Sequence, residues 1–290
     1  MRATHEFHYR LPHRVRGFRP GSHPGLSIGA GQEFVSHVNL YDRPDPRRLD
    51  LRASLRSLRG EWLVRVNRQR AGVSIHAVVD VSASMAFGAH EPKLNIAAEF
   101  LESLGVSAFR AGDAVGLLAF DSRERSDLFV PPRVNRGAGS FLAAAVRGSV
   151  ERRGGAQNAG GGSGLEQAAA RLAGRDGLVF LVSDFHWPLE RLAPALDLLA
   201  HAYVVPLVVW DCAEIEPPRE NAFALLRDVE SGAQRTLWLR PKLRSRWREA
   251  VALRREQLNS VFASRSVRPL YLEGAFDAQV LSKYFFEGGT

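Results

Sequence analysis

A short polar motif directly follows an apolar run in the first third of the chain. Asp80, Ser82 and Ser84 occupy alternate positions after residues 73–79, so a carboxylate and two hydroxyls share one side of a tight loop. Ser163, in a glycine-rich stretch, and Asp184, after another apolar run, add a third hydroxyl and a second carboxylate. Hard oxygen ligands of this kind suit Mg²⁺ or Mn²⁺ and not zinc. These five residues are the candidate metal ligands.

The elements expected around these residues explain how they could meet. Residues 73–79 (VSIHAVV) are apolar and β-branched, which is typical of a buried parallel strand that ends at Asp80. Further strands are expected over 113–120, 178–182, 203–210 and 267–272, with a hairpin over 223–239. Helices are expected over 93–110, 141–150, 164–173, 189–200, 243–262 and 276–286. Ligands of such sheets bind at the carboxyl ends of the strands, where Asp80 and Asp184 both lie.

The alternation of strands and helices over residues 73–290 predicts an α/β fold with a doubly wound, mostly parallel sheet. Residues 1–72 differ, because repeated prolines and glycines exclude a long helix there. Partial alternation over 33–41 and 58–66 indicates two strands in this part. We therefore expect a small irregular or β-rich N-terminal lobe over 1–72 and a sheet domain over 73–290.

The net charge of +8 is concentrated at one end of the chain. Residues 1–72 hold 14 arginines, no lysine and six acidic residues, while the remaining residues balance. A basic lobe of this kind can attract nucleic acid, anionic lipid or an acidic protein. The alternative interpretation is that these arginines pair with acidic residues of the lobe and of the main domain.

Other features indicate a cytoplasmic protein that is not an enzyme. The single cysteine, Cys212, excludes an intramolecular disulfide, and no apolar segment is long enough to span a bilayer. The glycine-rich stretch 160–164 lacks the Lys-Ser/Thr ending of a phosphate-binding loop. The nine histidines show no zinc-binding spacing, and neither Ser82 nor Ser84 lies in a GxSxG elbow. We therefore expect no catalytic residues.

The same residues also resemble a known site. A DxSxS motif after a buried strand, a hydroxyl in a glycine-rich loop and an aspartate that ends a later strand are similar to the metal-ion-dependent adhesion site (MIDAS) of von Willebrand A domains. The resemblance implies that Ser82, Ser84 and Ser163 bind the ion directly or through water, and that Asp80 and Asp184 act through water. It also implies an open coordination position for a partner's carboxylate. Ser163 departs from the family, where threonine is usual, but retains the hydroxyl.

Nearly the whole chain resembles a bacterial group of von Willebrand A-like proteins of unknown function that are encoded beside MoxR-type AAA+ ATPases. The matching landmarks are residues 31–34, 41–50, 53–56, 116–120, 183–185 and 228–232. Pro44 and Leu51 depart from the pattern, which usually has glycine and tryptophan at these positions. The compact length is similar to that of members from methanol-oxidation operons.

The resemblance implies a metal-dependent protein-binding module, an adaptor for a MoxR-type ATPase in the assembly or activation of another protein complex. The partner would be the ATPase or its target, recognised through an acidic residue by a bound Mg²⁺ or Mn²⁺. The alternative is a nucleic-acid-binding protein that uses the basic lobe and the basic helix over 243–262. A DNA affinity that falls steeply with salt and ignores Mg²⁺ would identify this alternative.

Overall fold

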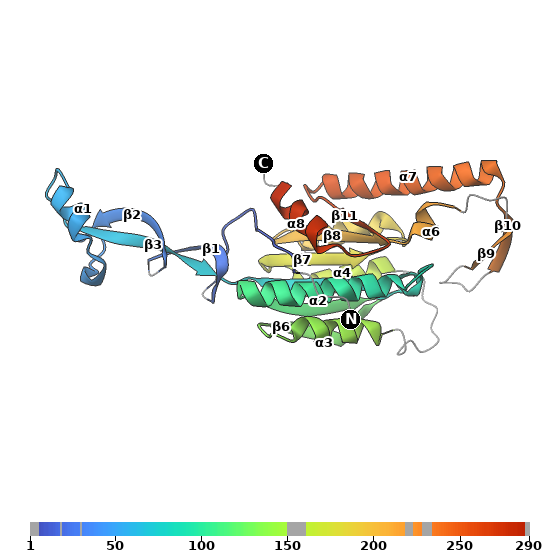
Figure 1. The fold of residues 1–290 in the computed structure, drawn as a ribbon, viewed down its shortest axis with the longest axis horizontal. Coiled ribbons are helices and arrows are strands. Elements are labelled where there is room, and N and C mark those ends of the chain that lie inside the picture. Colours follow the sequence, from blue (N-terminus) through green and yellow to red (C-terminus); the bar gives the residue numbers. More distant parts are fainter. Residues whose placement is uncertain are drawn as a thin grey trace.

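A six-stranded sheet forms the centre of the protein (Figure 1). The computed structural model describes residues 6–17, 19–29, 31–149, 161–217, 223–227 and 234–287. The strands follow the order β11-β8-β7-β4-β5-β6, and only β6 runs antiparallel to its neighbour. Their bounds are β4 Ser74–Asp80, β5 Ala114–Phe120, β6 Glu124–Arg133, β7 Gly177–Ser183, β8 Ala202–Trp210 and β11 Leu270–Glu273. The expected α/β fold with a doubly wound, mostly parallel sheet is confirmed.

Helices cover both faces of this sheet because the strands are apolar on both sides. Alternate residues of β4 show the division: Ile75, Ala77 and Val79 face one helical layer, and Val78 faces the other. The first layer consists of α2 (Lys93–Ala111), α3 (Ala138–Arg147) and α8 (Ala278–Glu287). The second consists of α4 (Gly161–Leu172), α5 (Leu192–Leu198) and α7 (Pro241–Ala263). The sheet is thereby enclosed between two helical layers.

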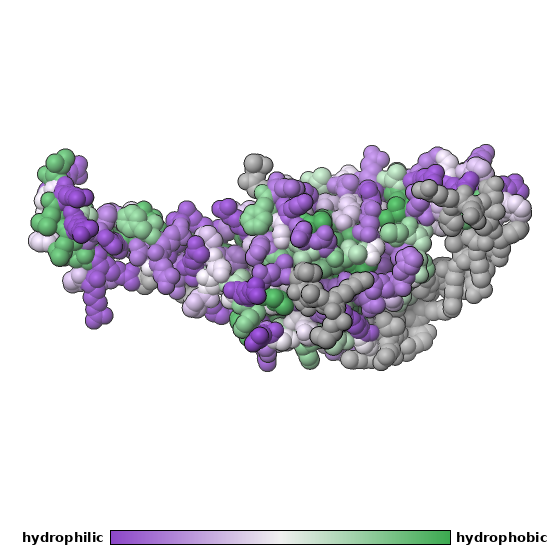
Figure 2. Space-filling view, in the orientation of Figure 1, coloured by the Kyte–Doolittle hydropathy of each residue, from purple (hydrophilic) through white to green (hydrophobic). Residues whose placement is uncertain are grey.

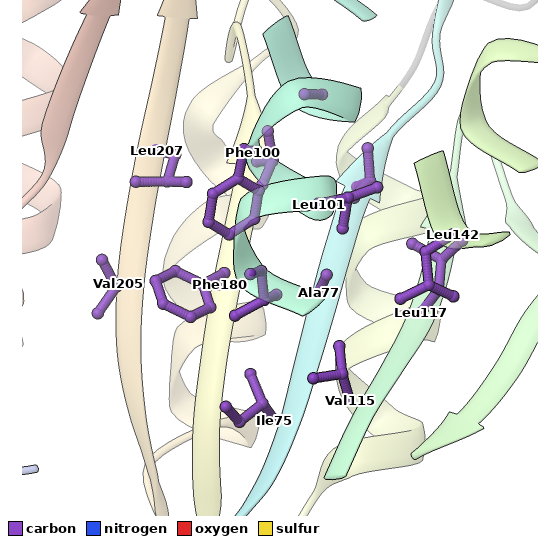
Figure 3. Close-up of a cluster of buried hydrophobic side chains, with 14 of the residues drawn as sticks. Ile75, Ala77, Phe100, Leu101, Val115, Leu117, Leu142, Phe180, Val205 and Leu207 are labelled. Carbon is purple, nitrogen blue, oxygen red and sulfur yellow. The ribbon is translucent and has the colours of Figure 1, made fainter. Parts of the chain in front are cut away.

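Aromatic rings fill the core beneath α2. Phe180 of β7 lies against Phe100 of α2, with ring centroids 5.0 Å apart in an edge-to-face arrangement (Figure 3). The N-terminal segment also reaches this core. The ring centroid of Phe7 lies 6.2 Å from that of Phe100 and 6.1 Å from that of Phe180. Leu11 and Val15 are buried in the same cluster. Residues 7–15 therefore pack as part of the large sheet domain.

The rest of the N-terminal region forms an arm that projects from this domain (Figure 1). Its antiparallel sheet has the order β1-β3-β2, formed by Pro20–Gly29, Leu63–Ala71 and Glu33–Asn39 respectively. The connection from β2 to β3 contains the short helices η1 (Pro46–Arg48) and α1 (Leu51–Arg56), which lie at the far end of the arm. This confirms the expectation of a small β-rich N-terminal region.

Prolines lie in one edge strand of the large sheet and beside the other. β6 carries Pro131 and Pro132, which donate no backbone hydrogen bond. On the other edge, the pairing of β11 with β8 begins at Leu207, directly after Pro206. β6 was not among the expected strands, because its residues (ERSDLFVPPR) are too polar to resemble a buried parallel strand.

Short elements complete the chain. The expected hairpin is confirmed as β9 (Phe223–Arg227) paired with β10 (Gln234–Trp238), and its predicted turn at 230–232 lies outside the described residues. The remaining short helices are η2 (Ala83–Ala86), η3 (Leu189–Arg191) and α6 (Cys212–Ile215). Within the described ranges, no helix is long and apolar enough to cross a membrane.

Candidate metal-binding site

The loop after β4 brings the first three candidate ligands together. Asp80, at the end of the strand, is fully buried and accepts a 2.8 Å hydrogen bond from the backbone N–H of Ser82 through Oδ1. This bond turns the chain into η2, so that the Oγ atoms of Ser82 and Ser84 lie 3.0 Å apart. A turn stabilised by its own aspartate is a local feature of the sequence. It fixes a pair of hydroxyls beside a carboxylate.

A later loop holds the second oxygen of Asp80. The hydroxyl of Ser183 donates to Asp80 Oδ2 at 2.6 Å, and the indole Nε1 of Trp187 donates to the same atom at 3.2 Å. Both residues belong to the chain around the end of β7, the neighbour of β4 in the sheet. Asp80 therefore acts as the link between the two loops, and its position is fixed by three hydrogen bonds.

Asp184 closes the site from the end of β7. It is fully buried, and the hydroxyl of Ser84 hydrogen bonds to its carboxylate. The Nζ atom of Lys93, whose side chain has no exposed surface, donates to Asp184 Oδ2 at 2.7 Å. The same Nζ atom donates to Glu214 Oε1 at 2.7 Å. The structure thus joins Asp80, Ser82, Ser84 and Asp184 in one group and adds a buried ammonium beside it.

The charges of the site act strongly on one another. Burial, together with the nearby charge of Asp184, raises the pKa of Asp80 to about 6. For Asp184, burial alone would raise the pKa, but the charges of Lys93 and His186 outweigh this effect and lower it. Asp184 therefore stays ionised to lower pH than Asp80. Asp80 sits where an additional cation would favour its ionised form.

The oxygen atoms fit a small divalent ion. Mg²⁺ binds oxygen at about 2.1 Å in octahedral geometry, so that adjacent ligands lie about 3 Å apart. Ser82 Oγ and Ser84 Oγ are hydrogen bonded to each other at 3.0 Å, and this separation is also compatible with two adjacent ligands of such an ion. Two neutral hydroxyls at adjacent positions, with two carboxylates directly behind them, form a donor set suited to Mg²⁺ or Mn²⁺. Ser82 and Ser84 would hold the ion, and Asp80 and Asp184 would neutralise its charge.

Ser163 lies on a third loop at the same edge of the sheet. It belongs to the first turn of α4, and its Oγ donates to the backbone oxygen of Ser122 at 2.8 Å. Ser122 follows the end of β5, the other neighbour of β4. A hydroxyl that donates its hydrogen retains lone pairs for a further interaction. Ser163 is thus placed near the end of β5, held there by its hydrogen bond to Ser122.

Lys93, His186 and Glu214 also belong to this site and were not among the residues predicted from the sequence. Asp184, His186 and Glu214 offer ligand atoms within 4.8 Å of one another and could hold a metal ion. Lys93 Nζ already contacts two of these carboxylates, so in the structure an ammonium serves as their cation. One signal was available: Lys93 is one of only three lysines among 39 basic residues. A second signal was that His186 lies two residues after Asp184, just beyond the end of β7.

Residues 42–257 match the family described as "Protein of unknown function DUF58". The chain belongs to the DUF58 family. It is 26% identical over 243 residues to uncharacterized protein Rv1480 of Mycobacterium tuberculosis, which covers 83% of this chain and 74% of the relative. Uncharacterized protein Mb1516 of Mycobacterium bovis matches with the same values.

Two solved structures are also similar to this DUF58 protein. BatB from Bacteroides thetaiotaomicron is 15% identical, with 75% of this chain and 98% of that chain covered and a TM-score of 0.48. An aerotolerance-related membrane protein from Bacteroides fragilis shows the same identity and coverage, with a TM-score of 0.43.

A pocket adjoins the candidate metal site. It has a volume of about 400 Å³ and is lined by His186, Trp210, Glu214, Ile215, Trp247, Ala250, Val251 and Arg254. The His186 and Trp210 rings stack with centroids 6.2 Å apart and planes 7° from parallel. Glu214 both lines the pocket and accepts from Lys93, which connects the pocket to the site. A ligand at the site therefore has an aromatic and aliphatic surface beside it.

Proposed function

We propose that this DUF58 protein is a metal-dependent protein-binding module. Its ion, Mg²⁺ or Mn²⁺, would be held by Ser82, Ser84 and Ser163, with Asp80 and Asp184 as the anionic groups behind it. The observation that carries the proposal is the pair of hydroxyls 3.0 Å apart, next to two buried carboxylates at the strand ends. A bound ion would offer a coordination position to a carboxylate of the partner.

The charge balance of the site supports the capture of an acidic group. The hydroxyl ligands are neutral, and the charge of Asp184 is shared with Lys93 at 2.7 Å. An ion in this setting would keep part of its positive charge and attract a glutamate or aspartate. The adjoining pocket, which includes Trp210 and Trp247, would receive an apolar side chain of the same partner segment.

We propose a MoxR-type AAA+ ATPase, or the protein on which it acts, as the partner, and the cytoplasm as the place of action. This part of the proposal rests on the resemblance in sequence and on the single cysteine. We also propose that the module binds without catalysing a reaction. Purified protein should therefore hydrolyse neither ATP nor ester and peptide substrates.

The test combines metal binding with partner capture. Calorimetric titration should show that Mn²⁺ binds the wild-type chain and binds the Ser84→Ala variant at least tenfold more weakly. Ser260→Ala, a change at an exposed serine on α7, serves as the matched control and should bind Mn²⁺ normally. A pull-down followed by mass spectrometry should recover the ATPase or its target with the wild type, and lose it with EDTA or with Ser84→Ala.

Asp80→Asn is the better variant for the carboxylate. Asp80 accepts three hydrogen bonds from two loops, so Asp80→Ala would also remove structural contacts. Equal Mn²⁺ affinity in the wild type, Ser84→Ala and Asp80→Asn would contradict the assignment of the site. Capture of the same proteins in all samples would show that the metal site does not recognise them.

A further inference from the structure

The far end of the N-terminal arm exposes a group of leucines. Leu51 and Leu55 of α1 are four residues apart and share a face of the helix, and Leu58 follows just beyond its end. Their exposed fractions are 58%, 84% and 104%. Apolar side chains with this spacing normally face a core. Here they point into solvent, and Figure 2 shows the apolar surface at this end of the molecule.

The helix packs on the arm through other residues. Ser54, which is buried, accepts a 2.9 Å hydrogen bond from the backbone N–H of Leu63 in β3 and donates to the backbone oxygen of Asp50. Asp50 also caps α1 by accepting from the backbone N–H of Ala53. The leucines therefore do not hold the helix in place. Their exposure leaves them free for an external contact.

Aromatic residues accompany the leucines. Tyr41 and Trp62 are both exposed. The backbone N–H of Leu40, the residue before Tyr41, donates a 2.8 Å hydrogen bond to the backbone oxygen of Trp62, and this bond joins the end of β2 to the start of β3. Both therefore lie at the same end of the arm as α1. Tyrosine and tryptophan are enriched where a membrane meets water, because one part of the ring is apolar and another can hydrogen bond.

A basic pocket opens beside the leucines. Its volume is about 430 Å³, and it is lined by Arg47, Arg48, Leu49, Asp50, Leu51, Arg52 and Arg65. Arg65 Nε lies 2.6 Å from Asp50 Oδ2, so the carboxylate of Asp50, the one acidic group in the lining of this pocket, is paired with an arginine. Arg48 pairs with Asp45 at 3.1 Å. Among the described residues, no ion pair engages the side chains of Arg47 and Arg52, which remain to bind an anion.

We propose that the end of the arm is a docking site for a membrane surface that contains anionic phospholipid. Leu51, Leu55 and Leu58 would enter the boundary between headgroups and acyl chains, and the arginine pocket would bind the headgroup phosphate. Guanidinium groups suit phosphate because their donors match its oxygens in pairs. The exposed leucines favour a lipid surface over nucleic acid as the partner. Nucleic-acid phosphates would bind the arginines but would give the leucines no apolar surface to contact.

This docking site is independent of the metal site. It lies at the opposite end of the arm from the large sheet, and none of its residues contributes a candidate metal ligand. Membrane binding would thus persist in EDTA and in the Ser84→Ala variant. This difference separates a failure of the docking proposal from a failure of the proposed metal-dependent function.

The test is co-sedimentation of the full chain with vesicles. One set of vesicles contains phosphatidylcholine alone, and the other contains phosphatidylcholine mixed with phosphatidylglycerol. The wild type should sediment with the anionic vesicles only. Two double variants, Leu55→Ser with Leu58→Ser and Arg47→Gln with Arg52→Gln, should each weaken binding roughly tenfold or more. The first removes the apolar side chains that would enter the membrane, and the second removes two positive charges.

A matched control replaces equally exposed residues elsewhere. Phe141→Ser with Arg246→Gln changes an exposed apolar side chain of α3 and an exposed arginine of α7, and should leave vesicle binding unchanged. Circular dichroism and Mn²⁺ titration would verify that every variant is folded. Equal binding by all variants, or no binding to anionic vesicles, would overturn the proposal. Binding of inorganic phosphate, duplex DNA or an acidic peptide to the pocket, without binding to vesicles, would also overturn the proposal.

Discussion

Lys93 Nζ lies 2.7 Å from Asp184 Oδ2, and neither side chain has any surface exposed to water. Burial alone would lower the pKa of Lys93, but the charges of Asp184 and Glu214 outweigh this effect and raise it. Both partners are therefore charged in the folded protein. A buried ion pair of this kind is costly to break on one side only, because the remaining charge has no partner.

Lys93→Met is therefore expected to destabilise the protein in the absence of divalent ions, by about 3–5 kcal/mol. The same change should tighten Mn²⁺ binding, because it removes a positive charge beside Asp184. Urea unfolding and calorimetric titration measure the two effects. Lys242→Met, at an exposed position of α7, is the control and should change neither. Weaker Mn²⁺ binding in Lys93→Met would show that the lysine supports the ion instead of opposing it.

Divalent ions are expected to stabilise the protein more at neutral than at acidic pH. Burial and Asp184 raise the pKa of Asp80 to about 6, so without an ion the fold disfavours ionised Asp80 and loses stability as pH rises from about 4 to 6. An ion would offset this loss once Asp80 is ionised. The melting temperature should therefore increase on adding Mn²⁺ at about pH 7.5 by several degrees, and by much less at about pH 5. The same increase at both pH values would argue against Asp80 as a metal-site group.

His76 is expected to make the fold sensitive to acid. Burial, followed by the charge of Arg175, lowers the pKa of His76 to about 4, whereas an unfolded histidine titrates near 6.5. Its contribution to stability is complete above about pH 6.5 and is lost as pH falls towards 4, with about 2 kcal/mol lost by pH 5. His76→Val should flatten this part of the curve of unfolding free energy against pH. His90→Val, at an exposed histidine, should leave the curve unchanged.

Phe7 tests whether the N-terminal segment folds with the large sheet. Its ring is 1% exposed and contacts Phe100 and Phe180. Phe7→Ala should lower the free energy of unfolding of the whole domain by about 3–5 kcal/mol. Phe34→Ala, on the exposed surface of the arm, should cost less than about 1 kcal/mol. Similar small effects of both changes would mean that residues 1–72 are energetically separate from the sheet domain.

The parallel sheet was predictable from sequence because its strands are continuous apolar runs. The same runs locate Asp80 and Asp184, since each follows the end of a strand. Lys93 and Glu214 were not predictable as neighbours, because they lie 121 residues apart and meet only when α2 and α6 pack at one edge. The core position of Phe7 was hidden in the same way, since its flanking residues are polar and its partners lie in α2 and β7.

The prolines in one edge strand of the large sheet and beside the other bear on how this chain behaves at high concentration. An open edge strand offers backbone groups to which a second chain can add, and this is a common route to aggregation. Pro131 and Pro132 interrupt those groups on β6, and β11, which begins opposite the residue after Pro206, is only four residues long. The addition of a strand from another molecule is thus hindered at one end of β6, and β11 offers only a short length for it. Self-association through the edges of the sheet is therefore disfavoured, and this leaves the loops and the arm as the surfaces for contacts with other molecules.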